Sequence, residues 1–175
     1  MRYFLASIGL LLALLTASAQ AQLSIEITGG GANQIPIGVL RFVGEEALAQ
    51  RISDIVEADL QRSGRFRMLF AGSVEPLPSE AAQVNFGDWK NRNADALVIG
   101  SVVRLADGRF EARFRLLDVP KQTQIGGVAF TLTAQQVRTT AHRIADFVYE
   151  KLTGDRGVFS TRIAYVVKQG SRYEL

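Results

Sequence analysis

The chain has 175 residues, 47% of them hydrophobic, and its 20 basic and 17 acidic side chains give a formal net charge of +3. It contains no cysteine, which excludes a disulfide framework, a thiolate metal site, a cysteine nucleophile and a lipid-modified cysteine. Its basic residues are interspersed with acidic ones, a pattern of a solvated surface rather than of a nucleic-acid-binding patch. We therefore expect no nucleic-acid partner.

The first 21 residues have the three-part pattern of a secretory signal peptide. Arg2 supplies a positive charge, residues 4–15 are almost entirely apolar, and small residues close the segment. Ala19 and Ala21 are the small residues of an A-x-A cleavage site, and a second candidate site ends two residues earlier, at Ala19. An uncleaved anchor helix needs about 20 apolar residues, and this run is shorter. We expect cleavage, export and no membrane insertion of the mature chain.

A short strand is predicted at the start of the mature chain. Residues 23–28 alternate apolar and polar side chains, the period of a half-buried strand. Such a strand can pair with the edge of another protein's sheet through main-chain hydrogen bonds, or it can be an edge strand of its own sheet. The candidate partner-binding residues are Gln22, Leu23, Ser24, Ile25, Glu26, Ile27 and Thr28.

The three glycines that follow, Gly29, Gly30 and Gly31, are predicted to form a hinge. A dinucleotide-binding G-x-G-x-x-G motif starting at Gly29 would need a glycine at position 34, which is Gln34. A strand rather than a helix follows the triplet, so no helix amino terminus is available for a phosphate.

From residue 35 onward, the pattern predicts alternating strands and helices. Residues 35–42 form a dense apolar run, typical of a strand buried on both faces. Residues 45–63 have apolar side chains at helical spacing and are followed by Gly64 as the residue that ends the helix. Residues 65–70 are predicted as a strand. After a loop with a short helical stretch near residues 79–82, a second short helix over residues 86–93 buries Trp89.

The next part of the chain predicts a meander of three strands and a closing helix. Residues 96–104 and 110–118 form the clearest hairpin, with a turn around Asp107-Gly108, and residues 124–131 add the third strand. The closing helix covers residues 134–152. Its start carries a T-x-x-Q capping box made by Thr133 and Gln136, and Gly154 stands at its carboxyl end. The order of elements predicts an α/β fold, a mixed sheet with two main helices packed on one face.

The sequence offers no convincing catalytic or metal-binding pattern. His142, the one histidine, lies off the apolar stripe of its helix, which favours a solvated position, and no nucleophile-elbow sequence accompanies it. Asp59 falls within the apolar stripe of the first helix, and Arg62, three residues later, is its natural partner. Asp54 and Glu57 fit solvent-facing charges on that helix. We predict no enzyme activity, no cofactor and no metal.

Residues 157–175 do not fit the preceding domain. Residues 163–167 are predicted as a new strand, Gln169-Gly170 as a turn, and residues 173–175 as the start of a partner strand. A lone strand of this kind has no way to bury its apolar face, which suggests that a second domain begins here. The predicted organisation is a signal peptide (1–21), a mobile strand and joint (22–34), an α/β domain (35–156) and a junction (157–175).

Three stretches of the chain are similar to the TolB family. Residues 149–154 and 157–166 resemble the family's junction between its amino-terminal domain and its β-propeller. Residues 52–56, continued through Asp59-Leu60 to residues 63–66, resemble its first helix. Trp89, followed by residues 94–100, resembles the entry to its central strand. The resemblance covers the whole mature chain and implies that the chain stops at the start of the propeller.

The resemblance implies a non-enzymatic periplasmic component of the Tol–Pal system, which supports envelope integrity and cell division. It implies that the mature amino-terminal strand binds the carboxy-terminal domain of TolA. It also implies that the lipoprotein Pal is a partner only where the propeller is present. By architecture alone, a periplasmic module that activates a cell-wall synthase or belongs to a secretion assembly is the alternative; such modules commonly carry a lipid-anchored cysteine, which is absent here.

Overall fold

The computed structural model describes residues 34–70, 74–161, 164, 166–170 and 172–174. The predicted signal peptide, the partner-binding strand 22–28 and the glycine hinge therefore lie outside the described residues. Among the described residues, none of the helices combines the length and the apolarity needed to cross a bilayer.

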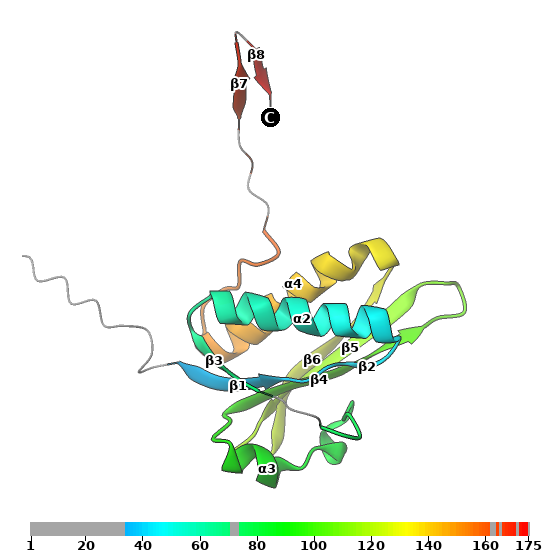
Figure 1. Cartoon of the computed structure of the whole chain (residues 1–175), viewed down its shortest axis with the longest axis vertical. Coiled ribbons are helices and arrows are strands. Elements are labelled where there is room, and N and C mark those ends of the chain that lie inside the picture. The colour runs from blue at the N-terminus through cyan, green and yellow to red at the C-terminus, as the bar shows by residue number, and fades with distance from the viewer. Residues whose placement is uncertain (1–33, 71–73, 162–163, 165, 171, 175) are drawn as a thin grey trace, which may run out of the picture.

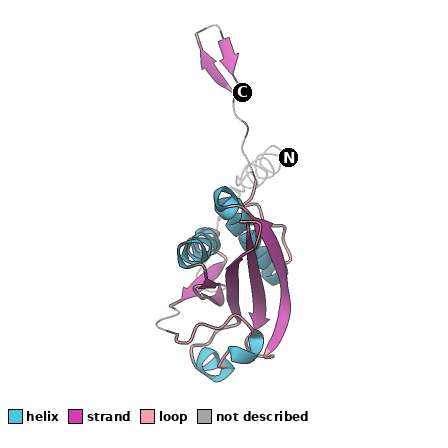
Figure 2. Cartoon of the chain, turned by 90° about the vertical axis from the view of Figure 1, so that its right-hand side faces the viewer, coloured by secondary structure: helices cyan, strands magenta, loops and turns pink. Residues whose placement is uncertain are grey.

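A mixed sheet forms the centre of the domain, as predicted. Its strands are β1 (Ile35–Val39), β2 (Val43–Gly44), β3 (Phe66–Leu69), β4 (Ala96–Arg104), β5 (Phe110–Asp118) and β6 (Thr123–Leu132). The order is β3-β1-β4-β5-β6, with β2 paired to β4. β1 is parallel to both β3 and β4, and β4, β5 and β6 form an antiparallel meander. Figure 2 shows the strands of this sheet in one layer.

The helices cover the sheet unequally. The two long helices, α2 (Glu46–Arg62) and α4 (Val137–Thr153), lie on one face, and the short α3 (Phe86–Asn91) lies on the other (Figure 1). Two 3-10 turns, Ala81–Gln83 and Ala134–Gln136, precede α3 and α4. The prediction of two main helices on one face is thus confirmed.

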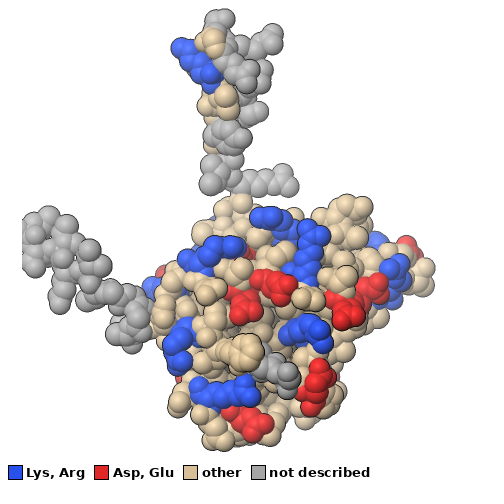
Figure 3. Space-filling view, viewed as in Figure 1, with Lys and Arg blue, Asp and Glu red and all other residues tan. Residues whose placement is uncertain are grey.

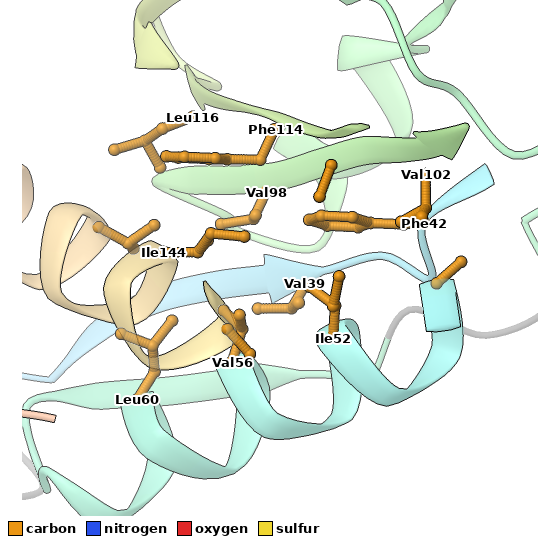
Figure 4. Close-up of a cluster of buried hydrophobic side chains, with 14 of the residues drawn as sticks. Val39, Phe42, Ile52, Val56, Leu60, Val98, Val102, Phe114, Leu116 and Ile144 are labelled. Atoms are coloured by element: carbon orange, nitrogen blue, oxygen red, sulfur yellow. The ribbon is translucent and has the colours of Figure 1, made fainter. Parts of the chain in front are cut away.

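Burial of the predicted apolar stripes creates a core on each side of the sheet. Under α2 and α4, the stripe residues Ile52, Val56 and Leu60 meet side chains of the central strands, and Ile144 joins them from α4 (Figure 4). Each fully buried aliphatic side chain of this kind stabilises the fold by about 1.5–3 kcal/mol. A smaller cluster fills the opposite face around Trp89, which is buried as predicted.

The predicted ends of the elements are mostly confirmed. Gly64 follows α2 at φ 70° and Gly154 follows α4 at φ 80°, a left-handed backbone that glycine adopts without strain. The capping box of Thr133 and Gln136 is formed on both sides, but it caps the 3-10 turn Ala134–Gln136, and α4 begins only at Val137. β4 and β5 have the predicted bounds, and Gly108 lies in their turn at φ 83°.

The described carboxy-terminal strand lies further along the chain than predicted. Of the described residues in the predicted strand 163–167, Val167 belongs to β7 (Val167–Gln169), whereas Ala164 and Val166 lie outside it. β7 pairs with β8 (Arg172–Glu174) across the predicted turn at Gly170, and Val167 stands opposite Glu174.

Candidate functional site at the terminal junction

The described chain enters the domain beside the carboxyl end of α2. Gln34 Nε2 donates a hydrogen bond of 3.1 Å to the carbonyl oxygen of Gly64. The next residue, Ile35, donates its backbone N–H to the carbonyl oxygen of Arg65 at 2.9 Å and packs against the core. These two contacts fix the point at which the described chain enters the domain.

Segment 157–161, which follows α4, is fastened to that helix by one carboxylate. Asp146 Oδ1 accepts the backbone N–H of Phe159 at 2.6 Å, and Asp146 Oδ2 accepts that of Ser160 at 3.1 Å. Gly157 is buried against the same residue, and a Cβ at this position would lie 2.4 Å from the Cα of Asp146. The close approach requires glycine at position 157.

A row of aromatic rings joins segment 157–161 to α4 and β3. Phe66 of β3 meets Tyr149 of α4 edge-on at a centroid distance of 6.0 Å, and Tyr149 meets Phe159 edge-on at 5.7 Å. A hollow of about 230 Å³ beside them is lined by Ser63, Tyr149, Arg156, Val158 and Phe159. We call this end of the domain the terminal junction and define it by Gln34, residues 63–66, Asp146, Tyr149 and segment 157–161.

Next to the terminal junction, Asp59 connects α2 to α4, and here one prediction was wrong. The predicted pair is present, because Arg62 Nη2 donates to Asp59 Oδ1 at 2.5 Å. His142, predicted to be solvated, is instead only 17% exposed, with Nδ1 2.5 Å from Asp59 Oδ2. It lies on the seam where α2 packs against α4. Its partner is 83 residues away in sequence, so helix periodicity alone could not reveal the contact.

The remaining carboxylates of α2 lie on its solvent face, as predicted. Asp54 and Glu57 are exposed. The carboxyl of Glu57 is nevertheless partly shielded from water, and this desolvation, followed by the nearby charge of Asp54, raises its pKa above the usual value. Both line a cleft of about 520 Å³ between α2 and the residues that follow β1 and β3, with the strongly exposed Phe70 on its rim. Acidic and basic side chains are interspersed over the face in Figure 3.

The described groups at the terminal junction hold chain segments against the domain. Within the described ranges, no group of three or more histidine and acidic side chains could hold a metal ion. Both nitrogens of the His142 imidazole are occupied, one by Asp59 and the other by Arg138. The fold and the terminal junction therefore define an α/β module that fastens an entering and a leaving chain segment at one end.

Comparison with known sequences identifies the module. The sequence model of the TolB amino-terminal domain matches residues 23–125, and the chain belongs to this family. The matched range includes the predicted binding strand and the domain through the start of β6.

Relatives and a solved structure agree with this assignment. The Tol-Pal system protein TolB of Nitrosomonas europaea is 53% identical over 176 residues, which cover 100% of this chain and 41% of that protein. The protein of the same name from Aromatoleum aromaticum is 54% identical over 94% of this chain and 38% of its own length. The crystal structure of TolB from Acinetobacter baumannii superimposes with a TM-score of 0.64 at 33% identity, over 77% of this chain and 32% of that one. The chain thus spans about two-fifths of the length of these curated relatives.

Proposed function

We propose that this protein is a component of the Tol–Pal envelope system and acts in the periplasm, where it supports outer-membrane integrity and cell division. The observation that carries the proposal is family membership, together with 53% identity to a Tol-Pal system protein across the whole chain. The signal-peptide pattern of residues 1–21 supports export.

Its activity in this proposal is binding, through the strand that precedes the domain. The backbone of residues 22–28 extends the sheet of a partner protein. The side chains of Leu23, Ile25 and Ile27 face an apolar surface of that partner. The partner is the carboxy-terminal domain of TolA. Gly29, Gly30 and Gly31 let the strand leave its own domain at low steric cost.

The geometry of the entry point is compatible with this mode of binding. Residue 34 is tied to the domain by its bond to Gly64, and the fold proper begins with Ile35. Fully extended, residues 22–33 reach at most about 40 Å from that point. Binding of Pal, which the resemblance assigns to a propeller, is not proposed for residues 1–175.

The test is titration calorimetry of the purified chain with the TolA carboxy-terminal domain. Ile25→Pro removes a main-chain donor and fixes φ, so it should weaken binding by about tenfold or more. Ile25→Val keeps both the donor and the β-branched side chain, and it should bind within about threefold of the parent chain. Equal affinities for the proline variant and the parent would refute binding through this strand.

A further inference from the structure

A pocket lined by residues other than the predicted binding strand lies beside the terminal junction. It has a volume of about 440 Å³ and is bounded by α2, by the amino-terminal half of α4 and by the end of segment 157–161. Its lining consists of Asp59, Arg62, Arg138, Thr139, His142, Phe159, Ser160 and Thr161.

Hydrogen bonds at the pocket assign the proton of the single histidine. The Asp59 carboxylate can only accept, so His142 Nδ1 carries the hydrogen and donates it at 2.5 Å. The guanidinium of Arg138 can only donate, and its Nε lies 3.3 Å from His142 Nε2, which therefore accepts. The imidazole is neutral in this arrangement.

The charges around the pocket leave a surplus of positive charge. Arg62 and Asp59 form an ion pair and offset one another. Arg138 is exposed, and within the described part of the chain its recorded partner is the neutral imidazole rather than a carboxylate. Segment 159–161 adds hydroxyl and aromatic groups but no charge. With His142 neutral, the pocket therefore has a formal charge of about +1 from Arg138.

Protonation of His142 would change the pocket at one place. A proton on Nε2 turns this nitrogen from a hydrogen-bond acceptor into a donor. The hydrogen bond from Arg138 Nε to Nε2 is then lost, and the Arg138 guanidinium can donate to another group. The charged groups that face His142 are Asp59 and Arg62 from α2 and Arg138 from α4. Nε2–H and the Arg138 guanidinium then present two neighbouring donors to the pocket.

We propose that this pocket binds a carboxylate group, held by Arg138, and that protonation of His142 strengthens the binding. A carboxylate is planar and matches the paired donors of a guanidinium. A surplus of about one positive charge suits a monoanion, whereas a phosphate dianion beside the buried Asp59 would be left with uncompensated charge. The inference does not rest on binding of TolA, because it concerns different residues.

The single histidine allows a direct test by NMR. The imidazole resonance of His142 in the purified chain is followed during titration with sodium acetate and, at matched ionic strength, with sodium chloride. Acetate should give a saturable shift, with at least about fivefold tighter binding near pH 5.5 than near pH 8.

Variants on α4 separate the pocket from general charge effects. Arg138→Gln should weaken acetate binding by about tenfold or more. Arg143→Gln removes an exposed charge next to His142 that does not line the pocket, and it should bind like the parent chain. An unchanged amide spectrum for each variant verifies that the fold is intact.

Three results would overturn the proposal. In the first, chloride gives the same saturable shift as acetate. In the second, Arg138→Gln binds acetate as tightly as Arg143→Gln does. In the third, sodium phosphate binds at concentrations where acetate does not, which would assign the pocket to phosphate instead of a carboxylate.

Discussion

The attachment of segment 157–161 to α4 depends on Asp146, and Asp146→Ala should release it. The variant removes both acceptors, so the backbone N–H groups of Phe159 and Ser160 lose their partners. Release should be local, because the α4 side chains that form the core, such as Ile144 and Val148, are unaffected.

The loss of local stability in Asp146→Ala can be estimated from how exposed the two hydrogen bonds are. The bond to Phe159 is partly buried and should contribute about 1–1.5 kcal/mol, and the exposed bond to Ser160 about 0.5 kcal/mol. Their loss amounts to about 1.5–2 kcal/mol of local stability. At 1.4 kcal/mol per factor of ten, amide protection of these two residues should fall about 10- to 30-fold.

Hydrogen exchange read out residue by residue is the appropriate assay. Asp155→Ala, in the exposed turn that follows α4, is the matched control, and it should leave the protection of Phe159 and Ser160 unchanged. If protection in Asp146→Ala stayed within twofold of the parent chain, the carboxylate would not be what holds the segment. If instead all core amides lost protection equally, the release would be global and the local argument would be wrong.

Two further predictions concern stability. Gly38→Ala should lower the free energy of unfolding by about 1–3 kcal/mol in urea, because its Cβ would lie 2.7 Å from the ring of Trp89. A Cβ at Gly87 would meet only the Asn85 side chain, so Gly87→Ala should change the free energy of unfolding by less than about 0.5 kcal/mol. Equal changes in the two variants would contradict the packing argument. The raised pKa of Glu57 means that its contribution to stability is present below the unfolded-state pKa and is lost as pH rises through the folded-state pKa. As the pH rises from about 4 to about 7, Glu57→Gln should therefore become more stable relative to the parent chain. If the urea denaturation midpoints of the two chains differed by the same amount at every pH, this prediction would be excluded.

Local chemistry made much of the fold predictable. Turns and helix ends depend on residues close in sequence, so Gly64, Gly108 and Gly154 marked their positions directly. The pair of Asp59 and Arg62 was predictable for the same reason, since the two residues are one helical turn apart.

Contacts between distant elements were less predictable. Periodicity indicates which face of a helix is buried, but not which residues of a second helix contact the edge of that face. The contact of His142 with Asp59 was therefore missed. The buried carboxylate was the available signal, because a buried Asp commonly has more than one donor. The fastening of segment 157–161 by Asp146 was missed because main-chain donors leave no mark in the sequence. The predicted binding strand lies outside the described residues and stays a prediction.

The position of β1 has a mechanical consequence. β1 lies between β3 and β4 and is parallel to both, and its amino end is where the chain enters the domain. A tension applied along the chain at Gln34 would act along the axis of β1 and would load its hydrogen bonds to both neighbours in shear, many at once rather than one after another. A partner that pulled on the preceding segment would therefore be pulling on an internal strand of this sheet, one that is hydrogen-bonded on both sides.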